Sequence, residues 1–131
     1  MLAAMKLLGI DYGKKRVGVA LSDSEGLMAF PHVVLKNDEQ FFADLCAILK
    51  SEEVDEIVIG ESKAPDGSHN EIHAAVTELI TDLTLETGLP IHLEPEQYST
   101  QEAIRFQGRT EKTDAAAAAI ILNSFITRTK Q

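Results

Sequence analysis

Cysteine is almost absent from this sequence, which contains Cys46 alone. A single cysteine cannot form an intramolecular disulfide, and the apolar neighbours of Cys46 indicate the buried side of a helix. No apolar run approaches the roughly 18 residues of a membrane-spanning helix, and the start of the chain is too short for a signal peptide. These absences exclude a disulfide-stabilised scaffold and predict a cytoplasmic protein that has no membrane segment.

Low-complexity tracts, internal repeats and linkers are absent as well. The chain has 131 residues, of which 44% are hydrophobic and 25% are charged. These fractions are close to the averages for soluble globular proteins, and the length suits one compact core. We therefore expect a single domain over residues 1–131.

Positive charge is scarce overall, since the formal net charge is −9. This balance argues against tight nonspecific binding to nucleic acid. The charges are unevenly spread, because residues 37–104 hold 16 acids and only Lys50 and Lys63 as bases, whereas the rest holds 10 bases and 5 acids. Such asymmetry is typical either of a protein with one positive face or of ordinary solvated helices, and both interpretations stay open.

The hydrophobic periodicity predicts an α/β fold. Apolar runs bounded by turn residues indicate strands, and a period near 3.6 indicates helices. The strands are expected at 6–11, 17–21, 30–35, 56–60 and 90–93, and the helices at 38–52, 72–87, from Ser99 or Thr100, and 113–127. Asn37 or Asp38 would cap the first helix, and Gly88 would end the second.

This βββαβαβαα order determines how the strands pair. Hairpins join the first three strands, and strands alternating with helices imply parallel pairing. We expect a five-stranded mixed sheet with helices on both faces.

Three carboxylates stand where strands end or a helix begins. Asp11 ends the first strand, Glu96 follows the fifth, and Asp114 opens the last helix. Several carboxylates that converge are the ligands that Mg²⁺ or Mn²⁺ prefers. Each also has a structural interpretation: Asp11 as a turn cap, Glu96 as a solvated loop acid, and Asp114 as a partner of the helix dipole. Glu61, after the fourth strand, is a fourth candidate.

Basic residues flank the proposed acids, which is where a phosphate backbone would need them. The first cluster is Lys14, Lys15 and Arg16, and the second is Arg105, Arg109 and Lys112. Ordinary surface bases are the alternative for Arg105 and Arg109. The four histidines show no zinc-binding spacing.

The segment from Gly9 to Asp23 resembles the opening motif of the YqgF/RuvX family. The resemblance runs along the whole chain and includes Ile57 to Gly60, Gly67, Glu96 to Thr100, and Asp114 with the alanines and Ile120 to Leu122 that follow. It implies a ribonuclease H-like fold and a divalent-metal nuclease that acts on structured nucleic acid. The implied roles are trimming the 5′ end of precursor 16S ribosomal RNA, or resolving Holliday junctions.

The resemblance also implies residue roles. Asp11, Glu96 and Asp114 would bind two metal ions that activate water and stabilise the leaving oxygen. Lys14 and Arg16 would orient phosphate. A homodimer is the further expectation for symmetric junctions.

The chain departs from the family pattern around Glu96. Pro95-Glu96-Gln97 replaces an Asp-Glu-Arg triplet, and the segment from Gln107 to Thr113 is shorter and less basic than usual. We hypothesise that Glu61 compensates for the missing carboxylate, which Glu61→Gln would test through metal affinity.

Two other functions are considered. A catalytically weakened protein of the same fold would bind nucleic acid, ribosomal precursors or a protein partner. The segment Asp11-Tyr12-Gly13 with Gly18-Val19-Ala20 also resembles the phosphate-binding hairpin of the actin and sugar-kinase superfamily, although those proteins use two such domains and this chain is too short for them.

Overall fold

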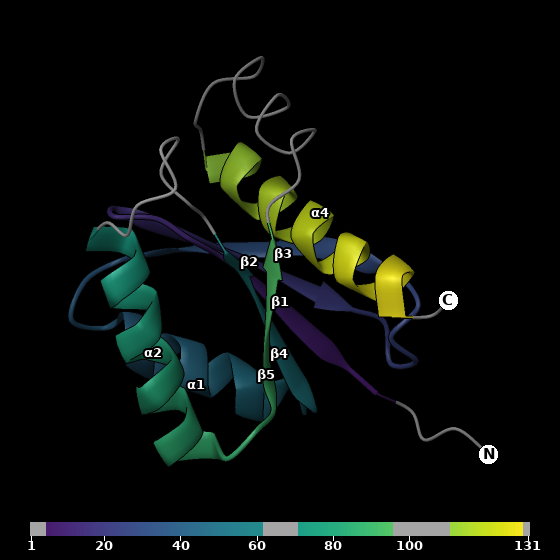
Figure 1. Cartoon of the computed structure of the whole chain (residues 1–131), viewed down its shortest axis with the longest axis horizontal. Helices are drawn as coiled ribbons and strands as arrows, with labels where there is room; N and C mark the ends of the chain where they lie inside the picture. The colour runs from purple at the N-terminus through teal and green to yellow at the C-terminus, as the bar shows by residue number, and fades with distance from the viewer. Residues whose placement is uncertain (1–4, 62–70, 96–110, 130–131) are drawn as a thin grey trace.

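The computed structural model describes residues 5–61, 71–95 and 111–129. Five strands and three helices follow in the predicted order within these residues (Figure 1). Their bounds are β1 Leu7–Tyr12, β2 Arg16–Ser22, β3 Ala29–Lys36, α1 Phe41–Ser51, β4 Glu56–Glu61, α2 Glu71–Thr87, β5 Ile91–Pro95 and α4 Glu111–Thr129. The short helix expected from Ser99 or Thr100 lies outside the described residues.

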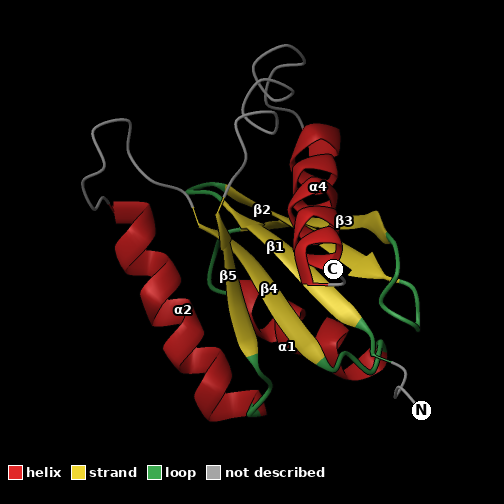
Figure 2. Ribbon diagram, turned by 45° about the vertical axis from the view of Figure 1, so that its right-hand side comes forward, coloured by secondary structure: helices red, strands yellow, loops and turns green. Residues whose placement is uncertain are grey.

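The strands form one mixed sheet in the order β3-β2-β1-β4-β5. β1 is antiparallel to β2 and parallel to β4, and β5 is parallel to β4. The hairpins of the first half and the parallel crossovers of the second half are therefore confirmed. α4 covers one face of the sheet, and α1 and α2 lie on the other (Figure 2).

The face toward α1 and α2 carries the larger core. Alternate residues of the central strands point into it, as the period of two in a strand requires. Aromatic packing joins this core to the end of β1, where the Tyr12 and Phe41 rings meet edge to face at 6.0 Å. Its fully buried side chains include Leu8, Ile10, Val17, Val19, Leu45, Ile57, Ile59 and Leu83.

The other face accommodates α4 at short range because small residues line the contact. Ala118 and Leu122 of α4 are fully buried against the sheet. A β-carbon added at Gly9 of β1 would lie 2.9 Å from the β-carbon of Leu122, closer than real side chains approach. The alanine-rich sequence of α4 therefore serves close packing as well as helix propensity.

Two helix ends test the cap predictions. The residue before α1 is Gln40, which makes no side-chain cap, so the predicted caps at Asn37 and Asp38 are wrong. Asp38 Oδ1 instead accepts a hydrogen bond from the Gln40 backbone N–H at 2.9 Å. This bond forms a local turn, and the helix begins only after it, at Phe41. Gly88 ends α2 as predicted, with φ of 70° and its N–H donating to Thr84.

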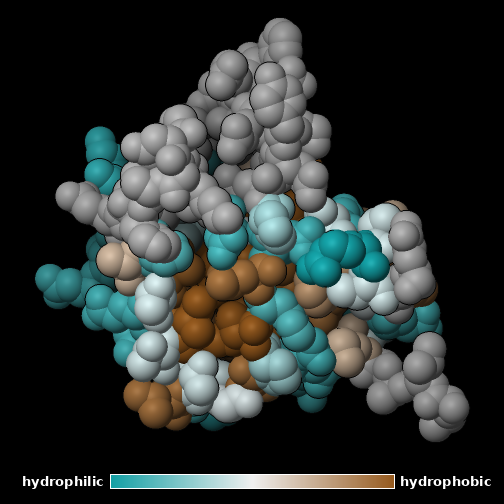
Figure 3. Space-filling model, in the orientation of Figure 1, coloured by the Kyte–Doolittle hydropathy of each residue, from teal (hydrophilic) through white to brown (hydrophobic). Residues whose placement is uncertain are grey.

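The two sheet edges differ in how they are protected. β3 carries Pro31, and a bulge interrupts its register with β2 between Val19 and Ala20, both of which discourage pairing with another strand. β5 exposes 42% of Leu93 at the opposite edge. Apolar side chains gather on the surface between α2 and α4 (Figure 3).

Within the described residues no helix is long and apolar enough to span a membrane.

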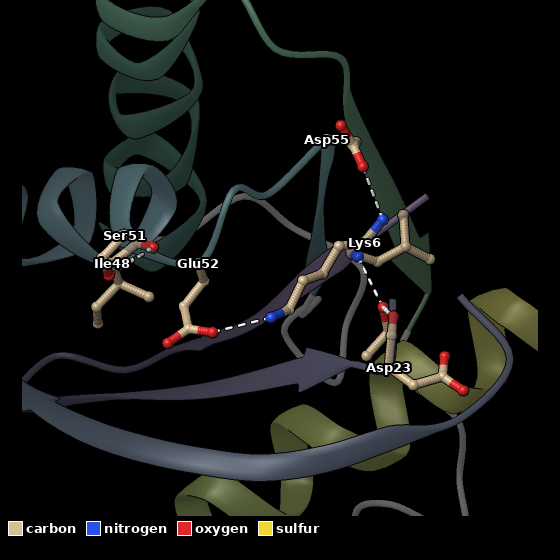
Figure 4. A network of polar contacts seen from close by, with 8 residues as sticks. Lys6, Asp23, Ile48, Ser51, Glu52 and Asp55 are labelled. Carbon is tan, nitrogen blue, oxygen red and sulfur yellow. Dashed lines mark hydrogen bonds and ion pairs between the residues drawn. The ribbon is translucent and has the colours of Figure 1, made fainter. Parts of the chain in front are cut away.

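Polar contacts fix the start of β1, at the opposite end from Asp11. The Lys6 backbone N–H donates to Asp55 at 2.8 Å, and its ammonium donates to Glu52 at 2.8 Å (Figure 4). The next N–H, that of Leu7, donates to the Ser22 hydroxyl at 2.7 Å. These contacts join β1 to β2 and to the segment before β4.

Candidate metal and nucleic-acid site

Asp11 lies near the carboxyl end of the central strand β1 and is only 6% exposed. Its neighbours Ile10 and Tyr12 pack toward the α1 and α2 core, so alternation along the strand directs Asp11 to the α4 face. In the antiparallel register Asp11 stands directly opposite Gly18 of β2. The sequence therefore places a buried carboxylate beneath the start of α4.

Asp114, in the first turns of α4, is 1% exposed. It reaches the sheet because β2 has no side chain at the contact: a β-carbon at Gly18 would overlap the Asp114 carbonyl oxygen. Gly18 is also the cross-strand partner of Asp11. Asp11 and Asp114, far apart in the sequence, are thus brought to the same end of one sheet face.

Arg16 completes this group at the start of β2. Its Nε lies 3.0 Å from Asp114 Oδ2, and the side chain is 34% exposed, against 2% for Asp114. The two buried carboxylates supply hard oxygen donors, which fit a divalent cation of the Mg²⁺ or Mn²⁺ class.

The remaining predicted acids are placed differently. Glu96 lies outside the described residues. Glu61 pairs with Pro95, and its neighbour Gly60 pairs with Glu94, whose side chain contacts α4. Alternation consequently puts Glu61 on the α1 and α2 face, across the sheet from Asp11. Within the described part of the chain no cluster of three metal-ligating side chains is found.

The first basic cluster lies at the turn between β1 and β2. Lys14, Lys15 and Arg16 line a cavity of about 380 Å³ at the β1–β2 turn. Lys36, which was not among the residues expected from the sequence, lines the same cavity from the end of β3. In the second cluster, Arg105 and Arg109 lie outside the described residues. Lys112 belongs to the first turn of α4.

A half-buried ion pair that sequence reasoning also missed fixes the far end of α4. Glu94 of β5 is 1% exposed, and its Oε1 accepts hydrogen bonds from Arg128 Nε at 3.1 Å and Nη2 at 2.5 Å. The Ser124 hydroxyl donates to Glu94 Oε2 at 3.0 Å. Helical spacing of Ser124 and Arg128, together with the alternation of β5, was the only signal in the sequence. This contact holds the C-terminal end of α4 on the sheet.

Two solved structures share the fold. Thermus thermophilus RuvC, solved in complex with a Holliday junction substrate, aligns with a TM-score of 0.65 at 18% identity and covers 96% of each chain. The fowlpox virus Holliday junction resolvase aligns with a TM-score of 0.58 at 11% identity, over 97% of this chain and all of that one. At these identities the likeness concerns architecture, and the expected ribonuclease H-like fold is confirmed.

Sequence relatives are much closer. A protein of Nitratidesulfovibrio vulgaris strain Miyazaki F, named "Putative pre-16S rRNA nuclease", is 38% identical over 93% of this chain and 93% of its own length. One of the same name from Oleidesulfovibrio alaskensis is 34% identical over 93% and 92%. The family model described as RuvX, Holliday junction resolvase, matches residues 5–128. Because the family model matches residues that include Asp11, Asp114 and all five strands, the chain belongs to the RuvX family.

Proposed function

We propose that this chain is a divalent-metal-dependent nuclease that hydrolyses phosphodiester bonds of structured nucleic acid as a single domain. The observation that carries the proposal is the placement of Asp11 and Asp114, both almost completely buried, at the same end of the α4 face, where each adjoins Gly18. Burying two like charges is costly unless a cation offsets them. Membership of the RuvX family supports a nuclease as the use of such a site.

Asp11 and Asp114 would hold the metal, and Glu96 is proposed as the third ligand. When bound, a divalent ion lowers the pKa of water and stabilises the oxygen that leaves. Mg²⁺ and Mn²⁺ both suit carboxylate oxygen ligands. The Arg16 guanidinium keeps Asp114 oriented, as the 3.0 Å contact between Nε and Oδ2 supports.

The basic residues beside the acids would bind the substrate. Lys14 and Lys15 are exposed at the β1–β2 turn, beside Arg16, where their ammonium groups can meet backbone phosphates. Arg105, Arg109 and Lys112 are proposed for the same task. Contacts to phosphate position a nucleic acid without selecting its sequence, so they suit recognition by shape.

Precursor 16S ribosomal RNA is our first choice of substrate, because the two relatives above are named for it. A four-way DNA junction is the second, from the family description. The RNA substrate implies a cytoplasmic location. A junction substrate would in addition favour a homodimer, since a symmetric junction offers two equivalent cleavage positions.

Cleavage assays choose between these substrates. The purified protein is incubated with labelled precursor RNA and, separately, with a labelled four-way junction, in Mg²⁺, in Mn²⁺ and in chelator. We expect cleavage only with metal, and preferentially of the RNA. Preferential cutting of the junction would make the protein a resolvase.

A catalytically weakened binding protein is the alternative, favoured by the Pro95-Glu96-Gln97 replacement. It predicts that a folded protein binds the RNA but cuts neither substrate under any of these conditions. That result would overturn the nuclease proposal.

A further inference from the structure

The cavity beside the acidic site has an unusual charge for this chain. Its lining includes four bases and one acid, whereas the whole chain has a formal net charge of −9. The lining residues are Lys14, Lys15, Arg16, Val34, Lys36, Asn37 and Asp38. A hollow lined by more bases than acids suits an anion.

Two of these bases are cross-strand neighbours on the same face of the sheet. Arg16 of β2 pairs directly with Lys36 of β3 in the antiparallel register. Side chains at such a pair share one face, with β-carbons about 4.5–5.5 Å apart, and like charges there destabilise the sheet. Asp114 offsets part of the Arg16 charge, and a bound anion would offset the charge of Lys36, so the pair suits a site that binds a ligand.

The cavity is built from more than loose surface lysines. The Asn37 side-chain amide donates to the Gly13 carbonyl at 2.8 Å, and the Asn37 backbone N–H donates to the Lys15 carbonyl at 2.9 Å. These bonds tie the β1–β2 turn to the end of β3. The backbones that carry Lys14 and Lys15 are therefore held beside Lys36 before any ligand arrives.

The cavity also lies on the same face as the acids. Val33 and Leu35 pack toward the α1 and α2 core, so the alternate residues Val34 and Lys36 face α4, as Arg16 does. Lys36 is separated from Asp11 by two strand spacings and about two residues along the sheet, which amounts to roughly 12 Å. This separation suits a phosphate close to the one that is cut, along the same strand of nucleic acid.

We propose that this cavity binds a backbone phosphate diester of the substrate near the scissile one, and that Lys36 is a substrate-binding residue. The inference deepens the proposed nuclease function and rests on it for the identity of the ligand. Arg16 would have two roles, because its Nε contacts Asp114 and its side chain also lines the phosphate cavity. The substrate would then run from the acids over the ends of β2 and β3.

Binding without cleavage tests the inference. The affinity of the whole protein for a labelled RNA stem with a single-stranded 5′ tail is measured in chelator over a series of salt concentrations. The variants are Lys36→Gln, which removes the charge, and Lys36→Arg, which keeps it. Lys50→Gln is the matched control, because Lys50 is an exposed base in the last turn of α1, on the opposite face.

Each phosphate contact contributes about 0.7–0.9 to the slope of log affinity against log salt. We expect Lys36→Gln to lose about that much slope and to bind several-fold more weakly, with Lys36→Arg and Lys50→Gln close to the wild type. The melting temperature of Lys36→Gln should not fall, because the substitution relieves the repulsion with Arg16.

Equal slopes for Lys36→Gln and Lys50→Gln would overturn the inference, and so would a wild type that does not bind the RNA. Cleavage in Mn²⁺ is measured separately on the same samples. If the wild type cuts RNA while Lys36→Gln binds it normally, the nuclease proposal stands and the proposed phosphate cavity is refuted. If the wild type fails to cut but shows the Lys36-dependent slope, the phosphate cavity stands and the nuclease proposal is refuted.

Discussion

Gly18 of β2 lies directly against the backbone of Asp114 in α4, so that any side chain at position 18 would overlap the Asp114 carbonyl oxygen. Gly18 is also the cross-strand partner of Asp11, so the same glycine adjoins both acids. The position serves the site rather than the sheet, since glycine weakens a strand interior.

Gly18→Ala should therefore destabilise the protein although alanine suits a strand better than glycine. In an open strand the change would stabilise by about 0.5–1 kcal/mol. Here we expect a loss of about 1–3 kcal/mol in the free energy of unfolding, because α4 must move away from β2. Urea denaturation measures this loss. Unchanged or increased stability would mean that the helix shifts at little cost.

Asp11→Asn should prevent the rise in melting temperature that Mn²⁺ gives the wild type, because it removes one of the two buried carboxylates proposed to hold the metal. At one hundred times its dissociation constant, a ligand stabilises the protein that binds it by about 2.7 kcal/mol, and we expect only the wild type to gain this. Equal metal-induced shifts in the two proteins would place the metal elsewhere.

Arg128→Met should lower the melting temperature, because it leaves the Glu94 carboxylate buried without its charged partner. Hydrogen bonding to Glu94 raises the pKa of Arg128 above its usual value, which indicates that the charged form is the one stabilised. The cost is reduced by the 56% exposure of Arg128. Adding Glu94→Gln to Arg128→Met should restore part of the melting temperature. If the double variant melts below the single one, the pair is not the cause.

Acid should weaken the contact between Glu52 and Lys6. The hydrogen bond from the Lys6 ammonium lowers the pKa of Glu52 below its usual value. A carboxyl with a lowered folded pKa stabilises the protein above its unfolded pKa, about 4.3, and loses that contribution as the pH falls through the folded pKa. Lys6→Met should accordingly be less stable than the wild type at neutral pH. The difference should close below about pH 4 in pH-dependent urea unfolding, and a gap independent of pH would contradict the ion pair.

Apolar periodicity predicted the strands and helices, their order predicted the mixed pairing, and Gly88 predicted the end of α2, because these depend on local periodicity and turn chemistry. The sequence predicted Asp11 at the end of the first strand, and the structure places that strand at the centre of the sheet. That Asp114 lies at the same end of the α4 face depends on Gly18, whose role only the packing of α4 reveals.

Contacts between distant residues escaped the sequence analysis. Glu94 and Arg128 are separated by 34 positions, and nothing local distinguishes this acid from its exposed neighbours. Lys36 was overlooked because a base at the end of a strand is ordinary until the register sets it opposite Arg16. Asp38 was mistaken for a helix cap because the same side chain also stabilises a turn before a helix.

The most direct test of the nuclease account is the single-turnover rate at which Asp11→Asn cuts precursor 16S ribosomal RNA in Mn²⁺, compared with the wild type. Glu25→Gln, a change of an exposed acid in the β2–β3 turn, is the matched control. The account predicts that Asp11→Asn falls by at least about a thousandfold, equivalent to roughly 4 kcal/mol of activation free energy, while Glu25→Gln cuts at the wild-type rate. An Asp11→Asn protein that cuts as fast as the wild type would contradict it.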